Sequence, residues 1–377
     1  MYIKEIKTDK EFDSVKNEWT DFEKKVDNKN ITSSYIWQRT WWKHFGHIDN
    51  NQYGFDKKLS ILFLYNEKKE LCVIAPFCIV KRKFKRIFCY KSVEFIAQQW
   101  GATYLDFVSS DLSKDEIDYI FDWLKKNRKY DLIYLRYIPE FTSNFDLKSE
   151  NATVLSGCPE IEGESYSNVR KKYYSKNLKH KLNRIHNKID RENTNINNVI
   201  INGENILNYI DNISLVSKSK KFSGKHSIYL DPKKESFIKD LVFNFSVKSN
   251  CILLFYNKKL CAYNLGYYYN KKYFAVDASY NRKIIELENY SIGNITYDNL
   301  VRDTFSKEIN EFCFGTGIDS YKLRFTKKVC KIYNVLYKGN TLKSGLMYKK
   351  KLSVNKHIEN NFLKELNEKI PQEKLNQ

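Results

Sequence analysis

The sequence predicts an α+β fold divided between two domains, and three observations support this. The chain has 377 residues, which is too long for one ordinary domain. Aromatic residues make up 15% of it and are mostly Tyr (28) and Phe (24), which suit β-sheets. Strand-like apolar runs also alternate with helix-periodic segments in both halves of the chain. We therefore expect two cores, each a mixed central sheet flanked by helices.

The first half mixes predicted helices and strands. A helix is expected at 9–27, and a second after the cap Ser33-Ser34, where large aromatics recur every four residues and share one face. Runs at 58–65 and 70–80, joined by a polar turn, predict a β-hairpin. Further strands are expected at 86–95, 103–109 and 131–137, a helix at 113–127, and a loop from Pro139 to about residue 165.

A basic helix is predicted over 166–192. Its apolar residues recur at i, i+4, i+7 and i+11, and its other face carries Lys and Arg. These apolar positions are Leu178, Leu182, Ile185 and Ile189. The charged face fits a solvated surface and a clamp for phosphates equally well, so both interpretations stay open.

The second half repeats the α+β plan. Helices are expected at 204–220, 232–249 and 291–308, strands at 251–257, 260–269, 272–280, 311–315 and 329–338, and a helical turn near 319–326. The domains are expected at 1–160 and 193–345, with the basic helix between them and a polar tail at 346–377. Strand 272–280, helix 291–308 and strand 311–315 form a β-α-β crossover, which opens a crevice at the strand ends where ligands bind.

Charge and cysteine usage limit the setting. A net charge of +20 suggests polyanionic partners, although lysine is abundant throughout the chain. The eight cysteines lack C-x-x-C spacing and predict reduced, buried thiols. No apolar run reaches 18 residues and the N-terminus has no apolar leader, so we expect a cytoplasmic protein without a transmembrane segment. His44 and His47 lack further ligands at metal-binding spacing, and no metal is expected.

Candidate chemistry lies on both sides of the crossover. Ser291 can cap the crossover helix and Gly293 leaves its first amides unshielded, which suits a pyrophosphate. Across the crevice, the glycines of Gly-Thr-Gly (315–317) fit a turn or a close approach of the backbone to a ligand. Lys322 follows and could stabilise an oxyanion, and Asp277 is either a general base or a satisfied strand-end aspartate.

These residues carry a resemblance to a known family. The antiparallel meander, Ser291-x-Gly293 and the closing FCFGTGIDSYKLRF resemble the acetyltransferase-type domain of the CelD-like branch of the GNAT superfamily. The likeness covers roughly residues 30–340. The chain departs from the family pattern at Cys313, where an acidic residue is usual, and it lacks the R/Q-x-x-G-x-G/A loop.

The resemblance implies two tandem GNAT-like domains and an acyltransferase acting from an acyl-CoA co-substrate on an amine, such as an amino sugar or sugar nucleotide for surface polysaccharide. The implied catalytic residues are Lys322, Asp277 and Tyr321. The implied donor-binding residues are Ser291, Ile292, Gly293, Asn294, Gly315 and Gly317. The candidate acceptor-binding residues are Lys171, Lys172, Lys179 and Arg184 of the basic helix. Asp106 in the first domain is a further candidate, and a structural role is the alternative for it. No DNA partner is expected, and peripheral association with an anionic membrane is left open.

Two alternatives remain. The chain is also similar to FemABX-type enzymes, which transfer amino acids from charged tRNA to cell-wall precursors and have a lysine in an aromatic-Lys motif that Lys322 matches. A single helix at 166–192, lying ahead of the second domain, argues against the tRNA arm of some of these enzymes. A non-catalytic, polyanion-binding protein with the same fold is the other alternative, favoured by Cys313 and the thin pyrophosphate loop.

Overall fold

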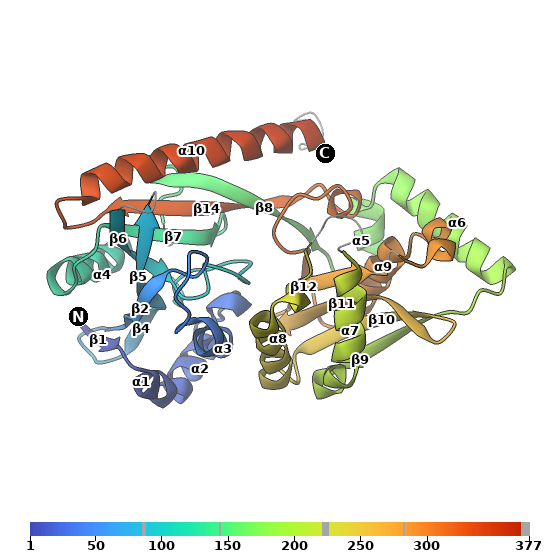
Figure 1. The fold of residues 1–377 in the computed structure, drawn as a ribbon, viewed down its shortest axis with the longest axis horizontal. Coiled ribbons are helices and arrows are strands. Elements are labelled where there is room, and N and C mark those ends of the chain that lie inside the picture. The colour runs from blue at the N-terminus through green and yellow to red at the C-terminus, as the bar shows by residue number, and fades with distance from the viewer. Residues whose placement is uncertain (85–87, 143–144, 221–225, 282, 371–377) are drawn as a thin grey trace. The chain divides into compact units, whose positions relative to one another are not determined.

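A computed structural model describes residues 1–84, 88–142, 145–220, 226–281 and 283–370 (Figure 1). The chain separates into two compact units. Unit 1 is Met1–Gly157 together with the segment from Cys330 onward, and unit 2 is Cys158–Val329. The expected boundaries differ from these units, because the C-terminal segment joins unit 1 and the basic helix region lies inside unit 2. Each unit is described by itself.

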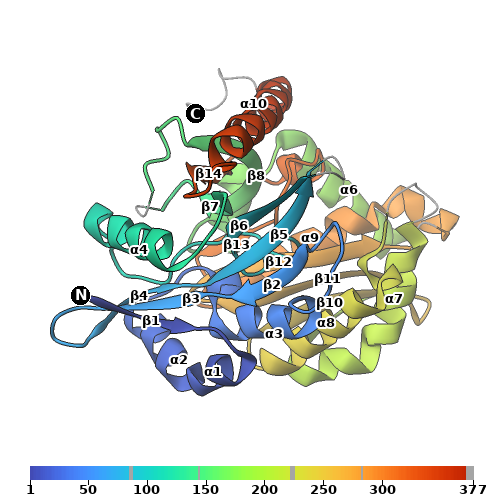
Figure 2. The same ribbon diagram turned by 60° about the vertical axis from the view of Figure 1, so that its left-hand side comes forward.

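Unit 1 begins with β1 (Tyr2–Ile6) and three helices. Thr8 forms a capping box with Glu11 at the start of α1 (Asp9–Ser14), and Val15 separates α1 from α2 (Lys16–Lys25). Ser34 caps α3 (Tyr35–Phe45) by accepting a hydrogen bond from the backbone amide of Trp37. The expected aromatic stripe of α3 is buried in the core, as its four-residue spacing predicted. These helices are visible at the N-terminal end in Figure 2.

Two sheets form the centre of unit 1. The hairpin is confirmed as β3 (Ile61–Tyr65) and β4 (Leu71–Ala75), and it forms a sheet with β1. The second sheet has the order β2 (Phe55–Leu59), β5 (Phe77–Phe84), β6 (Phe88–Phe95), β7 (Leu132–Pro139) and β14 (Val329–Lys338). Helix α4 (Lys114–Asn127) connects β6 to the parallel strand β7 and buries Ile117, Ile120 and Leu124. The run predicted at 70–80 is thus two strands, β4 and β5, which lie in different sheets and are separated by Pro76.

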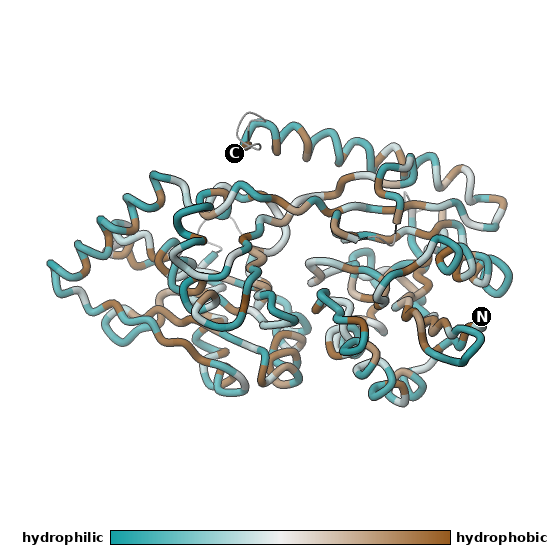
Figure 3. Tube along the Cα trace, turned by 180° about the vertical axis from the view of Figure 1, so that it is seen from behind, coloured by the Kyte–Doolittle hydropathy of each residue, from teal (hydrophilic) through white to brown (hydrophobic). Residues whose placement is uncertain are grey.

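One further expectation for unit 1 is wrong. Segment 103–109 is not a strand, because its ladder contact is a single bridge from Val108 to Ile74. The polar tail contains helix α10 (Ser344–Lys369), which buries Met347, Phe362 and Leu366. The helix that ends near C in Figure 3 is hydrophilic along most of its length, so its sparse apolar positions gave a weak sequence signal.

Unit 2 starts with a strand and a broken basic helix. The expected loop before residue 165 contains β8 (Ala152–Glu162), which passes from unit 1 into unit 2. The expected single helix over 166–192 is two helices, α5 (Tyr166–Tyr173) and α6 (Lys176–Arg191). Tyr174 is extended and packs its ring 5.0 Å from that of Phe325, and Ser175 then caps α6. Burying Tyr174 in the core therefore interrupts the helix.

The sheet of unit 2 positions the candidate site. Its order is β8, β13 (Glu311–Cys313), β12 (Lys272–Tyr280), β11 (Lys259–Tyr269), β10 (Ser249–Tyr256) and β9 (Ile196–Asn202). Strands β9 to β12 are antiparallel, and β12 runs parallel to β13 after α9 (Ile292–Thr304). The predicted β-α-β crossover is confirmed. Strand β9 was not predicted, because three asparagines interrupt its apolar pattern.

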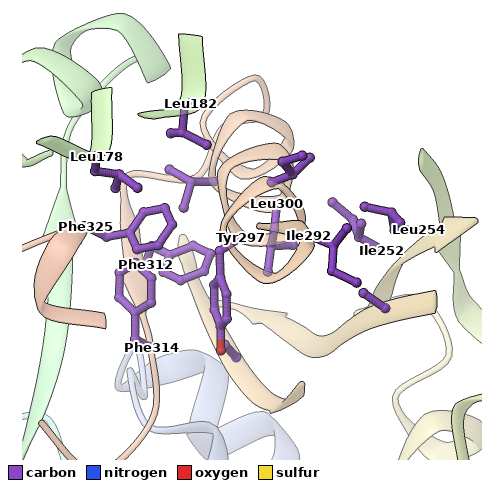
Figure 4. Packing of buried hydrophobic residues seen from close by; sticks show 14 of the residues in the cluster. Leu178, Leu182, Ile252, Leu254, Ile292, Tyr297, Leu300, Phe312, Phe314 and Phe325 are labelled. Atoms are coloured by element: carbon purple, nitrogen blue, oxygen red, sulfur yellow. The ribbon is translucent and has the colours of Figure 1, made fainter. Parts of the chain in front are cut away.

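Helices α5, α6 and α9 share one core with the sheet. Residues at alternate positions of β10, Ile252 and Leu254, contact α9, because successive strand residues face opposite sides (Figure 4). The apolar face of α6 covers the aromatic residues that follow α9, with Leu178 and Leu182 above Phe325 in Figure 4. The remaining helices of unit 2 are α7 (Ile210–Lys218), which contacts β11 and β12, and α8 (Pro232–Asn244). In the described part of the chain, no helix is both long and apolar enough to cross a bilayer.

Candidate functional site

The start of α9 faces a cavity of about 860 Å³ in unit 2. Ser291, Ile292, Gly293 and Asn294 all line it. The amides of Ile292 and Gly293 precede the first intrahelical hydrogen bonds, so no carbonyl of α9 can receive them. Added to the helix dipole, they favour an anionic group at this end of the cavity.

The predicted cap at Ser291 is wrong in its details. Ser291 adopts a left-handed conformation (φ 45°, ψ 48°) and its side chain makes no capping hydrogen bond. The first amides therefore stay available to a ligand rather than to a side chain. A Cβ atom at Gly293 would lie 3.4 Å from the Tyr280 ring, so alanine would fit there, whereas a large side chain would enter the cavity.

Asp277 lies behind the cavity wall in a network of three side chains. Its carboxylate accepts a hydrogen bond from the Tyr263 hydroxyl at 2.5 Å and forms an ion pair with Lys220 at 3.2 Å. Tyr263 and Lys220 line the cavity, while Asp277 is 8% exposed. Burial, followed by the charge of Asp277, raises the pKa of Tyr263 well above its ordinary value. Tyr263 is therefore a neutral donor at physiological pH and links Asp277 to the cavity.

A β-bulge between β11 and β12 sets the position of Asp277 in this network. The pairing of β11 with β12 shifts by one residue between Leu265 and Gly266, so Leu265 pairs with Asp277 and Gly266 with Ala275. Gly266 permits the close approach, because a Cβ atom there would lie 2.3 Å from the carbonyl oxygen of Phe274. The glycine in the strand was a sequence signal for this bulge.

Lys322 lies outside the cavity and holds the Gly-Thr-Gly turn. Its ammonium donates to the carbonyl oxygens of Gly315, Thr316 and Gly317 at 3.0, 2.8 and 3.2 Å. The side chain is 4% exposed and does not line the cavity. The expected contact of Lys322 with an acyl carbonyl is not seen, because its donors are directed at the turn. The structure thus favours a positioning role.

The two glycines of the turn are explained by backbone conformation. Gly315 has φ +76° and Gly317 has φ +99°, a region that residues with a side chain adopt at a cost. At Gly315 a Cβ atom would also lie 3.0 Å from the carbonyl oxygen of Ala275. Neither glycine lines the cavity, so the turn and its approach to β12 account for both.

Tyr321 is the member of the predicted aromatic-lysine pair that reaches the cavity. Its hydroxyl lies 3.4 Å from that of Tyr297, which also lines the cavity. Burial raises the pKa of Tyr321 to about 12. The phenol is therefore protonated at neutral pH and can donate a hydrogen bond or a proton to a ligand.

The basic residues of the cavity differ from those expected. Lys171, Lys172, Lys179 and Arg184 are not among the lining residues, while Lys181 and Arg324 are. Burial, with the neighbouring charges of Arg324 and Arg184, lowers the pKa of Lys181. Lys181 and Arg184 are three residues apart on α6, so they are neighbours on the helix surface. An anion bound here would relieve their mutual repulsion.

Asp106 lies in unit 1, and its carboxylate is engaged locally. One oxygen accepts the backbone amide of Phe107 at 2.8 Å, and the other accepts the hydroxyl of Thr142. The side chain is 8% exposed. These contacts support a structural role for Asp106.

A second buried cluster lies outside the cavity. The donor atoms of Cys158, Glu160 and Cys313 are within 4.8 Å of one another, a spacing that could suit a metal ion. However, the ammonium of Lys272 lies 2.6 Å from Glu160 Oε1 and supplies the cation there. We assign this cluster to a buried ion pair.

Sequence reasoning missed several cavity residues. They are Lys181, Lys220, Tyr263, Tyr297 and Arg324. Gly266 was a signal for the bulge beside Tyr263. Lys181 and Arg324 carried no distinctive signal in a chain so rich in lysine.

Comparisons with known proteins concern the same part of the chain and the fold as a whole. Residues 211–323 match the family model described as the acetyltransferase (GNAT) domain. The chain also resembles the crystal structure of FemX, with 9% identity, a TM-score of 0.57, and coverage of 93% of this chain and 99% of that one. A comparison with curated protein sequences gave no match.

Two lysylphosphatidylglycerol synthetase structures are similar as well. The L-PGS structure from Bacillus licheniformis has 12% identity and a TM-score of 0.50, covering 91% of this chain and 96% of that one. The C-terminal domain of a putative lysylphosphatidylglycerol synthetase from Agrobacterium fabrum has 11% identity and a TM-score of 0.50, covering 90% and 97%. At such identities these likenesses show the fold alone, and they confirm the predicted α+β class. The segment that matches the GNAT acetyltransferase model, residues 211–323, contains the Asp277 network, the α9 N-terminus and the Gly-Thr-Gly turn.

Proposed function

We propose that unit 2 transfers an acyl group from an acyl-CoA-type thioester to an amine, as the resemblance to the CelD-like branch implies. The observation that carries this proposal is the opening of the α9 N-terminus into a cavity of about 860 Å³, beside the crossover from β12 to β13. This volume lies in the range of small-molecule and cofactor sites.

The residues present fit a donor with a pyrophosphate. The free amides of Ile292 and Gly293 would receive one phosphate, and Lys181 and Arg324 would neutralise further charge. The thioester end would then lie toward Tyr263, Tyr297 and Tyr321, which line the same cavity. The donor supplies the activated acyl carbonyl.

The transfer step in this proposal uses the network of Asp277, Tyr263 and Lys220 beside the cavity. The amine nitrogen attacks the acyl carbonyl, a C–N bond forms, and the C–S bond breaks to release a thiolate. Asp277 takes the amine proton through the Tyr263 hydroxyl, which passes its own proton to the carboxylate as it receives the new one. Tyr321, neutral because its pKa is raised, gives a proton to the leaving thiolate.

The acceptor in this proposal is an amine on an anionic small molecule, such as an amino sugar or sugar nucleotide for surface polysaccharide. The support is the positive charge in and around the cavity, contributed by Lys181, Lys220 and Arg324. Lys171, Lys172, Lys179 and Arg184 would extend this charge beyond the lining residues.

The test is a thermal-shift and calorimetry screen with coenzyme A, acetyl-CoA and longer acyl-CoAs. Ligands that bind the folded state raise its midpoint with concentration. We expect a saturable shift that Gly293→Trp abolishes and Gly293→Ala retains, since a Cβ atom alone fits. Absence of a shift with every acyl-CoA, or a shift that Gly293→Trp leaves intact, would refute the site.

A second candidate is an aminoacyl transferase that uses charged tRNA. The specific support is the fold similarity to FemX and to the two synthetase structures, each spanning about nine-tenths of this chain. The two basic helices α5 and α6 lie within unit 2 rather than ahead of it, which weakens the earlier argument against tRNA.

Charged tRNA distinguishes the two donors. Transfer of a labelled amino acid that requires charged tRNA and stops after ribonuclease treatment would favour this second candidate. Acyl-CoA-dependent transfer that survives ribonuclease would favour the first. Salt-sensitive polyanion binding without turnover from either donor would favour a non-catalytic protein.

A further inference from the structure

Unit 1 contains a cavity of its own, with a volume of about 820 Å³. Three segments that are distant in the sequence line it. They are the β5–β6 hairpin, the end of α4, and the loop from β14 to α10. Figure 1 shows that loop beside the end of α4. None of the residues expected to be functional lies here, so the cavity is unassigned.

The lining is unusually basic. Of the fourteen described residues that line the cavity, seven are Lys or Arg, against 65 in the 377 residues of the chain. The enrichment is nearly threefold, so a uniformly lysine-rich surface does not account for it. The lysines are Lys81, Lys91, Lys125, Lys126, Lys129 and Lys343.

No ion pair to any of these six lysines is found within the described part of the chain. The seventh cation, Arg128, is different, because it pairs with Glu5 through two hydrogen bonds. The lining therefore carries six lysine charges against one carboxylate, that of Asp131.

The negative groups nearby are already engaged. Asp131 accepts the backbone amide of Lys91 at 2.7 Å through one oxygen and the hydroxyl of Thr341 through the other. The side-chain amide of Asn340 donates to the carbonyl oxygens of Lys125 and Arg128 at 2.7 and 2.8 Å. Two of the carbonyls at and just after the end of α4, which would otherwise repel an anion, are thus engaged.

The loop that supplies Asn340 is built to lie close. A Cβ atom at Gly339 would lie 2.3 Å from the carbonyl oxygen of Tyr130 and 2.6 Å from that of Asp131. The Gly339 amide also donates to the Asp131 carbonyl at 2.9 Å. Glycine is therefore required for the loop to approach Tyr130 and Asp131, which follow α4.

We propose that this cavity is a binding site for a ligand with closely spaced phosphates, carrying two or more negative charges. A single charge would leave most of the lysine charge uncompensated, while a pyrophosphate-type group matches several ammonium groups at once. The same chemistry occurs in a soluble diphosphate and in the clustered headgroups of an anionic lipid surface. Leu342 is an exposed apolar residue of the lining, and the exposed Phe88 directly precedes the lining residue Cys89; both would suit the lipid source.

Lysine footprinting of the full chain tests this site. The protein is acetylated with an amine-reactive reagent, and the labelling rate of each lysine is measured by mass spectrometry. The probes are inorganic pyrophosphate, and vesicles of phosphatidylcholine with or without phosphatidylglycerol. Lys10 and Lys68, exposed lysines of unit 1 outside the cavity, serve as controls within the same molecule.

We expect Lys125, Lys126 and Lys129 to be protected while both controls are not. At ten times its Kd a ligand leaves about one site in eleven free, so labelling slows roughly tenfold. Protection by pyrophosphate supports a soluble phosphate ligand, and protection by phosphatidylglycerol vesicles alone supports a lipid surface. Unchanged labelling with every probe, or equal protection of the controls, overturns the proposal.

Charge reversal provides a second, matched test. Lys126→Glu/Lys129→Glu should weaken binding of the protective probe at least tenfold, and Lys10→Glu/Lys68→Glu should change it less than twofold. Both variants alter net charge equally and leave unit 2 untouched, so phosphate binding at the α9 N-terminus cancels in the comparison. Equal losses in the two variants would show a general surface effect and refute a defined site.

Discussion

Replacing Lys322 with methionine is expected to destabilise unit 2, because three backbone carbonyls depend on its ammonium. Each hydrogen bond to a charged group contributes about 1.5–3 kcal/mol. The turn can relax and admit water, so we take the lower value for two of the three bonds, a loss of about 3 kcal/mol. For a unit of the length of Cys158–Val329, that loss lowers Tm by roughly 6–12 °C.

The assay is thermal unfolding with a matched control. Lys328→Met removes an ion pair to Glu162 whose side chains are 42% and 49% exposed, and it should cost less than about 1 kcal/mol. Lys322→Met should therefore melt well below Lys328→Met and lose transfer activity together with stability. If Lys322→Met instead melts with the control and still loses transfer, the lysine acts on the reacting groups and the positioning role is refuted.

Three further predictions concern the same unit. Asp277→Asn should cost about 3 kcal/mol by removing the carboxylate of the buried ion pair with Lys220, and adding Lys220→Met should recover part of that loss; strictly additive costs in urea unfolding would contradict the ion pair. Gly315→Ala should cost about 1–3 kcal/mol because its φ is +76°, and an unchanged urea midpoint would show that the turn relaxes freely. Burial raises the pKa of Tyr321 from 10.0 to about 12, so its contribution to stability is complete below pH 10 and is lost as the pH rises through 12. In Tyr321→Phe the urea midpoint should therefore fall less steeply with pH between these two values. An equally steep fall in the variant would contradict the raised pKa of Tyr321.

The crossover and the site region could be predicted from sequence because their signals are local. The strand at 272–280, the helix after Ser291 and the strand ending at Gly315 each have an apolar pattern bounded by a turn or cap. Their order alone implies a parallel pair and a crevice beside it. The position of the α9 amides at the cavity follows from that topology.

Elements whose stability comes from partners were missed. Strand β8 contains Gly157 and Pro159 and looks like a loop, yet it pairs in register with β13. The break at Tyr174 depends on a ring contact with Phe325, about 150 residues away in sequence. No local pattern reports such contacts, and the same holds for Lys322, whose three acceptors exist only after the turn forms.

The departure at Cys313 affects the pairing of strands more than the transfer chemistry. Cys313 pairs in register with Glu160 across the β8–β13 ladder, and Glu160 binds Lys272 of the next strand, β12. Burial acts to lower the pKa of Lys272, but Glu160 and Cys313 raise it above its ordinary value, so the ammonium remains charged.

A carboxylate at position 313 would place a second negative charge beside Glu160 in a site where both side chains are buried. Like charges in such surroundings are costly, and a thiol avoids that cost. In place of the acid expected on β13, Glu160 on β8 supplies a carboxylate. It pairs with β13 and binds Lys272 of β12, so it links three strands. The contacts of Asp277 with Tyr263 and Lys220 do not involve position 313, so the loss of an acid from β13 is compatible with an active transferase.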